Sequence, residues 1–475
     1  MGEKCVPEKL FLYVAVLAGT LIALLVPPMQ HPDENHHFWL SYNFSRGNFA
    51  HDVNGEVGVY STVEVWSFIQ HYSGERRADR TFSFWEAYFL GYLPVTETHQ
   101  EFIPIHPWIE VNPLPHMIAA IGILIGRTVF TLFGYADYYT PYNMLLVGRL
   151  SNLIFYISVI YFAIKTNLYF KKTIMMLALM PMSIFLGASM NVDSIFIAVS
   201  FLSFSVFLKF FTDVELVLDK RELIHTAIIV FVFATIKSPQ MIPMLFLLFA
   251  IPMAKFSSKV FWWKAVITCT TILGVGLLIA NLSGILFNDT AANFSPYASE
   301  LQRLQREFIT NNPFHLLVVI GNTFSNSYRF WFQSFFGTLG NLDLNFPLPI
   351  LFVFYAIFSY VFLYECLTSC NIHVKVRLFT LISQIVIIVG MVYGKYISWT
   401  PLVTGEIGGD QSTGIQGRYF IPMFMFSLFI LMSAFLKEFY FYKKLESISV
   451  NITTMGAMFF PITTVLYILM MYYMY

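Results

Sequence analysis

The feature that most constrains this chain is a series of long apolar segments that carry almost no charge. Several of them run for about 20 residues, which is enough for a helix to cross a hydrocarbon core of roughly 30 Å. The composition agrees, because 57% of the 475 residues are hydrophobic and 12% are charged, whereas a soluble domain typically carries about 25% charged residues. The sequence therefore predicts an all-α polytopic membrane protein with a single integral membrane domain over residues 1–475. The formal net charge is zero, so no nucleic-acid partner is suggested.

Lysine and arginine mark the cytoplasmic loops of membrane proteins, and here they separate pairs of apolar segments. No small-residue cleavage site follows the first segment, so we interpret it as a retained helix rather than a signal peptide. The pattern predicts about eleven transmembrane helices, a cytoplasmic N-terminus and an external C-terminus. The predicted spans are Leu10–Val26, Tyr142–Ile164, Ile174–Ser189, Ile195–Phe211, Leu223–Ile236, Pro239–Ala254, Phe261–Leu286, Leu348–Glu365, Val376–Tyr393, Tyr419–Leu436 and Thr453–Tyr475.

Two further apolar runs, Leu114–Phe133 and Phe314–Phe336, are also long enough to cross. If both crossed, the count would rise to about thirteen and Lys171-Lys172 would lie outside, against the charge rule. We therefore expect both to be juxtamembrane or partly inserted helices on the outer side. This topology predicts a long first extracytoplasmic loop at 29–113 and a second outer loop with juxtamembrane helices at 288–347.

Almost every charged motif of interest falls on the predicted outer side. A solute transporter would be expected to show internal repeats with interrupted helices at mid-bilayer, and the sequence shows no convincing repeat. Because the charged and polar residues gather on one face, at the membrane surface, the sequence favours a protein that acts on a lipid-anchored substrate over one that transports a solute.

The first cluster of ionisable groups follows the first span directly. Pro32, Asp33 and Glu34 read as an ordinary helix N-terminus, with proline at the first helical position and acids in the first turn. If a helix begins at Pro32, then Asp33, His36 and His37 share one face. A carboxylate beside imidazoles can act as a general base or hold a divalent cation.

Three other segments combine polar groups with apolar surroundings. Asn191 and Asp193 separate two apolar runs, either as a turn or as part of a binding site. Lys237 stands before the helix-breaking Pro239, where it either snorkels to the interface or holds a phosphate. The segment Gly337–Pro349 has the glycines of a tight loop.

The last of these segments stands at the start of the Tyr419–Leu436 span. Gln416 and Arg418 precede the apolar run there. An arginine at that depth is costly without a partner, and a phosphate suits its two-pronged donors. The alternative is an interfacial anchor formed by Arg418 and Tyr419.

In this order the motifs resemble a bacterial family of predicted membrane proteins of uncharacterised function, which is grouped with the GT-C glycosyltransferase superfamily. The resemblance covers nearly the whole chain. It is carried by five motifs: P-D-E-x-x-H-F (Pro32 to Phe38), S-x-N-x-D (Ser189 to Asp193), K-S-P (Lys237 to Pro239), G-x-L-G-x-L-D (Gly337 to Asp343) and Q-G-R-Y-x-x-P (Gln416 to Pro422).

The resemblance implies a GT-C-like helical bundle in the bacterial plasma membrane. It implies a glycosyltransferase that moves a sugar from a polyprenyl-phosphate carrier to a cell-envelope glycan or other extracytoplasmic acceptor. In such enzymes an acid in the first outer loop is catalytic, which matches Asp33 or Glu34, with His37 in support.

An inverting transfer needs a base for the acceptor proton and stabilisation of the leaving phosphate. The expected substrate-binding and phosphate-binding residues are Lys237, Arg418, Tyr419, Arg149, Arg329, Asn191, Asp193 and Gln416. A divalent cation, Mg²⁺ or Mn²⁺, held by Asp33, Glu34 or His37 is left open. Two alternatives stay open as well, a non-catalytic flippase or partner for lipid-linked saccharides and, third, a solute transporter.

Overall fold

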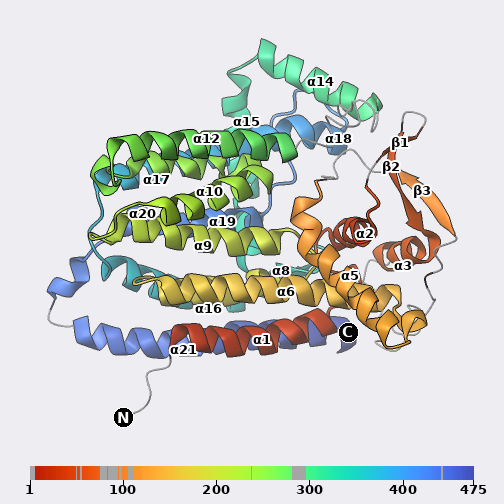
Figure 1. Cartoon of the computed structure of the whole chain (residues 1–475), viewed down its shortest axis with the longest axis horizontal. Helices are drawn as coiled ribbons and strands as arrows, with labels where there is room; N and C mark the ends of the chain where they lie inside the picture. The colour runs from red at the N-terminus through yellow and green to blue at the C-terminus, as the bar shows by residue number, and fades with distance from the viewer. Residues whose placement is uncertain are drawn as a thin grey trace.

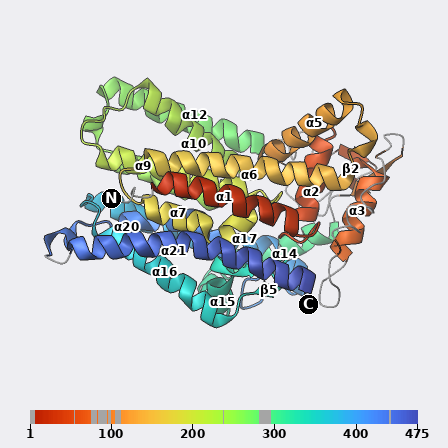
Figure 2. The same ribbon diagram turned by 90° about the horizontal axis from the view of Figure 1, so that it is seen from below.

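A computed structural model describes residues 6–49, 51–53, 56–74, 83, 95, 99–104, 112–236, 238–280, 296–439 and 442–474. Long helices run side by side as a bundle, and a small sheet with several short helices covers one end of it (Figures 1 and 2). The two chain termini lie toward opposite ends of the bundle (Figure 1).

The N-terminal half alternates between the bundle and the covered end. Its elements are α1 (Pro7–Leu25), α2 (Glu34–Phe44), β1 (His51–Val53), β2 (Glu56–Thr62), α3 (Val63–Gly74), β3 (Gln100–Pro104), η1 (Leu114–His116), α5 (Met117–Leu132), η2 (Ala136–Tyr138), α6 (Pro141–Thr166), α7 (Lys171–Leu179), α8 (Pro181–Gly187), α9 (Asp193–Thr212) and α10 (Lys220–Thr235).

The C-terminal half completes the bundle. Its elements are α11 (Ser238–Met241), η3 (Ile242–Ala250), η4 (Met253–Lys255), α12 (Lys259–Ala280), α14 (Pro296–Asn311), α15 (His315–Phe336), β4 (Thr338–Leu339), β5 (Leu344–Asn345), α16 (Leu348–Leu367), α17 (Val374–Ser398), α18 (Thr400–Thr404), η5 (Gly417–Phe420), α19 (Ile421–Phe424), η6 (Met425–Ser427), α20 (Leu428–Leu431), η7 (Phe435–Glu438), α21 (Tyr442–Leu469) and the π-helical turn η8 (Met470–Met474).

Within the described residues, eight helices are long and apolar enough to cross a membrane. They are Pro7–Leu25, Leu114–Leu132, Pro141–Thr166, Asp193–Thr212, Lys259–Ile279, Leu348–Leu367, Val374–Ser398 and Tyr442–Met474. The run at Leu114, which we expected to be juxtamembrane, therefore qualifies by length and composition. The run that forms α15 is helical as expected and is not among the eight.

Among the described residues, three predicted spans are divided into shorter helices. The span predicted at Ile174–Ser189 is two helices, α7 and α8, because Pro181 holds Met180 in an extended conformation. The span predicted at Pro239–Ala254 is mostly the 3-10 helix η3, which carries Pro243 in its first turn. The span predicted at Tyr419–Leu436 is a series of short turns that ends at Leu431.

Prolines and caps set the ends of the helices that position the polar residues. Helix α1 ends at Leu25, because Pro27 disfavours a helical conformation at the residue before it, and Val26 is extended. Helix α6 begins at Pro141, and the side chain of Thr140 accepts a hydrogen bond from the backbone N–H of Asn143. The chain that leaves α1 is thereby directed across the end of the bundle.

Two small sheets lie at the covered end. The strands β1, β2 and β3 form an antiparallel sheet in which Val59 pairs with Ile103. The strands β4 and β5 form a hairpin whose turn contains Gly340 at a φ of +65°. The amide of Asn341 in this turn donates a 3.1 Å hydrogen bond to the carbonyl of Met29. The tight loop predicted at Gly337–Pro349 is confirmed, and it packs beside the segment that follows α1.

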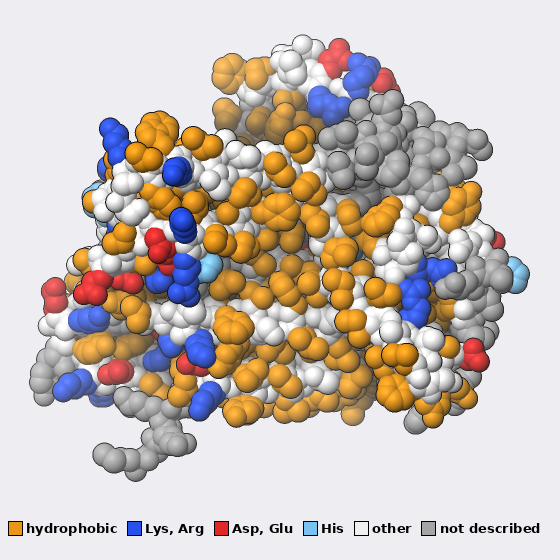
Figure 3. All heavy atoms as spheres, in the orientation of Figure 1, with side chains coloured by type: hydrophobic (Ala, Val, Ile, Leu, Met, Phe, Trp, Pro, Cys, Tyr) orange, Lys and Arg blue, Asp and Glu red, His pale blue; other side chains and the backbone are white. Residues whose placement is uncertain are grey.

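The other end of the bundle carries many of the lysines, and we call it the basic end. It is defined by contacts of Lys171 with Glu8, of Lys209 with Glu222 and of Lys255 with the carbonyl of Phe210. Figure 3 shows Lys and Arg side chains gathered at this end, with a broad hydrophobic surface between it and the covered end. The bundle therefore has an apolar middle section and two chemically different ends.

Candidate functional site

A cavity of about 630 Å³ opens at the covered end of the bundle. Its walls come from α2, η1, α14, α17 and the 414–419 segment, together with single residues from near the starts of α9 and α11. The polar and aromatic residues in its lining are Asp33, His36, His37, His116, Gln240, Gln302, Lys395, Ser398, Trp399, Gln416 and Tyr419. Elements that are far apart in the sequence thus build one polar site at the end of an apolar bundle.

Asp33 stands at the entrance of α2 and not within it. The helix begins at Glu34, and Asp33 has a left-handed backbone with a φ of +57°, a conformation that aspartate tolerates better than most residues. The prediction of a helix starting at Pro32 is therefore wrong. Asp33 and His37 nevertheless line the same cavity, as their spacing suggested.

Arg418 connects the two acids of the site. Its Nη2 donates a 2.6 Å hydrogen bond to Oδ2 of Asp33, and its Nε lies 3.2 Å from Oδ2 of Asp193. The Arg418 side chain is 1% exposed, the Asp193 side chain 7% and the Asp33 side chain 56%. Two carboxylates compensate the buried cation, and Asp33 carries the network out to the cavity.

The local sequence explains how Arg418 reaches this depth. Gly417 lies so close to α15 that a Cβ would come within 2.2 Å of the Trp331 carbonyl oxygen. The N–H of Gly417 donates a 2.8 Å hydrogen bond to the hydroxyl of Ser334. Only glycine permits this approach. The close packing of Gly417 places the next residue, Arg418, between the start of α9 and the start of α2.

Asn191 holds the segment that carries Asp33. Its Nδ2 donates a 2.7 Å hydrogen bond to the carbonyl of Pro32, and its Oδ1 accepts one from the N–H of Asp193 at 2.8 Å. Asn191 is buried and is not part of the cavity lining. The predicted Asn191 and Asp193 turn is thus both a turn and a support for the site, with Asn191 positioning Asp33 and Asp193 balancing Arg418.

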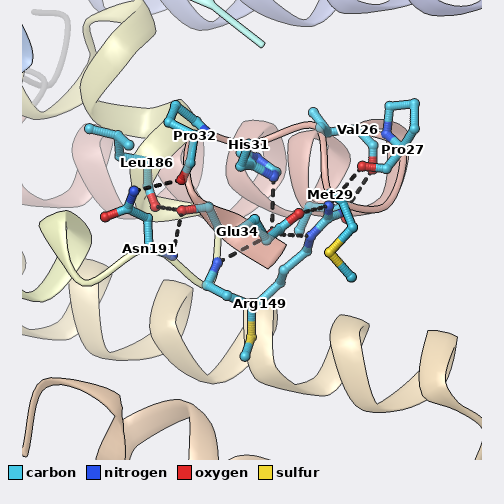
Figure 4. Close-up of polar contacts among 12 residues, drawn as sticks. Val26, Pro27, Met29, His31, Pro32, Glu34, Arg149, Leu186 and Asn191 are labelled. Carbon is cyan, nitrogen blue, oxygen red and sulfur yellow. Dashed lines mark hydrogen bonds and ion pairs between the residues drawn. The ribbon is translucent and has the colours of Figure 1, made fainter. Parts of the chain in front are cut away.

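Glu34 and Arg149 form a separate, fully buried pair (Figure 4). Nε and Nη2 of Arg149 donate to the two oxygens of Glu34 at 2.8 and 2.5 Å. The remaining Arg149 donors reach the carbonyls of Ala23, Val26 and Pro27. All five N–H groups of the guanidinium are used, so Arg149 closes the end of α1 and does not face a phosphate.

Electrostatics keeps Glu34 ionised and its neighbour His31 neutral. Burial raises the pKa of Glu34, but the charge of Arg149 and the hydrogen bonds of both neighbours outweigh it and hold that pKa far below its usual value. Burial lowers the pKa of His31 to about 4 although Glu34 opposes the shift. Both side chains are 0% exposed, and neither lines the cavity. Glu34 therefore has a structural place in the fold, away from the cavity that its predicted catalytic role would require.

The histidines of the cavity form their own pair. Nδ1 of His37 lies 3.0 Å from Nε2 of His116, and Nδ1 of His116 lies 3.1 Å from the carbonyl of Asn112. This chain fixes His37 in the wall of the cavity beside His36. The sequence pointed to His37, whereas His116 comes from a segment that had no recognisable motif.

The predicted phosphate-binding cations lie in different places in the structure. Lys237 lies outside the described residues, so its role stays a prediction. Arg329 is exposed on α15, where its guanidinium lies 5.7 Å from the ring centroid of Tyr328, and it is not part of the cavity lining. Lys395 lines the cavity instead, with Nζ 5.0 Å from the ring of Trp399 and 5.9 Å from that of Tyr419. A lysine near the external end of a predicted span was the signal that could have revealed it.

The metal site left open by the sequence does not fit these side chains. Among the described residues, no three His, Cys, Asp or Glu side chains gather as metal ligands. Both Glu34 oxygens are bound by Arg149, and His37 is paired with His116. Asp33, Glu34 and His37 therefore do not converge on one cation, and we derive no step through a metal.

Comparison with known proteins places the chain in a family. A family model described as predicted membrane protein, DUF2142, matches residues 16–427. The chain belongs to the DUF2142 family. No curated protein and no solved structure matches it.

The match to DUF2142 and the apolar helices together make this a multi-pass membrane protein. The matched range contains the cavity residues from Asp33 to Tyr419 and ends before α21. The candidate site therefore lies entirely within the part of the chain that matches the DUF2142 family model.

Proposed function

We propose that this protein is a membrane glycosyltransferase that moves a sugar from a polyprenyl-phosphate donor to a cell-envelope glycan or other extracytoplasmic acceptor. The observation that carries the proposal is one cavity, at the end of an apolar bundle, that combines a carboxylate, a lysine, amides and aromatic rings. The five motifs resemble a family that is grouped with the GT-C glycosyltransferases, which supports the same proposal.

The lining of the cavity suits a saccharide. Gln240, Gln302 and Gln416 bring amide groups that both donate and accept hydrogen bonds, as sugar hydroxyls require. Trp399 and Tyr419 add flat apolar faces beside these polar groups. A concave site with aromatic walls and a few placed polar groups is typical of a small-molecule pocket.

The cations suit the phosphate of the donor. Arg418 does not line the cavity itself but lies buried behind Asp33, and within the described residues its Nη1 has no hydrogen-bond partner. Lys395 contributes a second positive charge from the cavity wall. Charge-assisted bonds from such groups to phosphate are strong, and they would stabilise the negative charge that develops on the leaving phosphate.

Asp33 is the proposed base. It takes the proton of the acceptor hydroxyl while the acceptor oxygen bonds to the anomeric carbon of the sugar. The bond from that carbon to the phosphate oxygen breaks, and the polyprenyl phosphate leaves with the electron pair. Attack opposite to the leaving group inverts the anomeric centre. Arg418 orients the Asp33 carboxylate through the 2.6 Å hydrogen bond.

The topology completes the proposal. We place the basic end in the cytoplasm and the cavity on the external face of the bacterial plasma membrane, because lysines concentrate on the cytoplasmic side. In this arrangement the N-terminus is cytoplasmic, and the chain crosses about eleven times, with the short helices of the 174–189, 239–254 and 419–436 segments as crossings.

The test is sugar transfer by purified protein in proteoliposomes. A panel of radiolabelled polyprenyl-phosphate sugars would be offered together with isolated envelope glycans as acceptors. The proposal predicts labelled glycan with an inverted linkage. Movement of the donor across the bilayer without labelled product would instead show the alternative, a flippase that uses Lys395 and Arg418 for phosphate but needs no base.

A further inference from the structure

A second cavity, of about 480 Å³, lies at the basic end, away from the proposed catalytic site. It is bounded by α10, η3 and α12, and its walls are largely apolar. Phe210, Phe246, Phe249, Trp262, Val266 and Leu273 are among the residues that form them.

The cavity exists because two helices that meet at one end separate toward the other. Gly276 of α12 lies so close to α10 that a Cβ would come within 2.7 Å of the Ala234 Cβ. Nearer the N-terminal ends of both helices, Leu223 of α10 and Trp262 of α12 both line the cavity. Helix α12 packs against α10, but only 6% of its span is buried, so most of its surface faces away from the bundle.

Water is a poor occupant for this space. Apolar cavities stay dry because water finds too few hydrogen-bond partners in them, and an empty cavity forfeits the packing contacts of its walls. In a bilayer the apolar material beside α12 is acyl chain. The volume and the apolar lining therefore suit a lipid tail.

Basic residues close in sequence to the lining residues Asp219, Glu222 and Phe261 suit the head of the same molecule. Exposed Lys220 and Arg221 begin α10, and exposed Lys259 begins α12. Of the two acids in the lining, Glu222 pairs with Lys209, and Asp219 caps α10 by accepting a hydrogen bond from the backbone N–H of Arg221. Cations beside an apolar wedge are complementary to the phosphate and the chain of a phospholipid.

We propose that the cavity between α10, η3 and α12 binds one acyl chain of a membrane phospholipid, with the phosphate at the basic mouth. The bound lipid fills the space that these three elements enclose. This site is distinct from the proposed catalytic cavity, and its existence does not depend on glycosyl transfer.

The first test is lipid retention in native mass spectrometry of the full chain. Ala265 lines the cavity, so Ala265→Trp would fill it; Ile267 is 62% exposed on the same helix and does not line it, so Ile267→Trp is the matched control. Wild type and Ile267→Trp should retain a phospholipid that Ala265→Trp loses. Equal retention by all three, or a lipid-free dimer in wild type, would overturn the proposal.

The second test uses Cys269, which also lines the cavity, and does not depend on the folding of Ala265→Trp. In a chain whose other cysteines are changed to serine, delipidated protein would be alkylated before and after addition of phosphatidylethanolamine and phosphatidylglycerol vesicles. Labelling of Cys269 should slow several-fold with phospholipid. An unchanged rate would contradict occupancy of the cavity.

Discussion

Glu34→Gln should destabilise the protein strongly without touching the cavity. Glu34 accepts two hydrogen bonds from Arg149, at 2.8 and 2.5 Å, and one from the N–H of Met190 at 3.3 Å, and both side chains of the ion pair are 0% exposed. The substitution keeps the shape but leaves the guanidinium charge buried and uncompensated. Breaking one partner of such a pair costs about 3–5 kcal/mol, a large part of a typical stability of roughly 5–15 kcal/mol.

The assay is the free energy of unfolding in mixed micelles, with Glu300→Gln as the matched control. Glu300 is 53% exposed and pairs with Arg303 on the surface of α14, so the same substitution there should leave stability unchanged. The folded fraction of Glu34→Gln should retain its turnover, because Glu34 does not line the cavity. A variant as stable as wild type, or a folded but inactive one, would refute the structural role of the pair.

Three further outcomes follow from the structure. Lys395→Met should raise the donor concentration needed for half-maximal transfer by about tenfold or more, since a hydrogen bond to a charged group is worth roughly 1.5–3 kcal/mol; an unchanged dependence in a donor titration would show that this lysine is not a phosphate ligand. The pKa of His31 is lowered from 6.5 to about 4, so its neutral form stabilises the fold fully above pH 6.5 and this stability is lost as the pH falls toward 4. Melting measured between pH 6.5 and 5 should therefore depend less on pH in His31→Phe than in wild type, and equal slopes would contradict the assignment. A single cysteine placed at Lys172 should be labelled by a membrane-impermeant reagent only after cells are opened, and labelling of intact cells would invert the proposed topology.

The sequence predicted the class of the fold and the neighbourhood of the site, because both depend on local patterns. Long uncharged segments identify membrane helices wherever they pack. Asp33 was recognisable from its place after the first span, although the left-handed backbone that positions it depends on the distant Asn191. Its contact with Arg418, 385 residues away in the chain, has no local signal.

The misassigned residues show why partners matter more than residue types. Arg149 and Arg329 both have the chemistry of a phosphate ligand. Arg149 instead donates its hydrogen bonds to Glu34 and to carbonyls at the end of α1, and Arg329 does not line the cavity. Lys395 lies just after a predicted span, a position that a phosphate ligand and a snorkelling anchor share, so local sequence alone does not distinguish the two roles. The helix breaks at Pro181 and Pro243 could not be predicted from the prolines alone, because membrane helices often tolerate proline.

The central claim is that Asp33 is the base for sugar transfer, and Asp33→Asn tests it most directly. The amide keeps an oxygen that can accept from Nη2 of Arg418, so the site should stay assembled while the base is removed. Donor binding by the variant should match wild type, and transfer should fall by about a hundredfold to ten-thousandfold. Asp137→Asn, at an exposed position in η2, is the matched control and should transfer normally. Near-normal transfer by Asp33→Asn, with the donor still bound, would contradict the account.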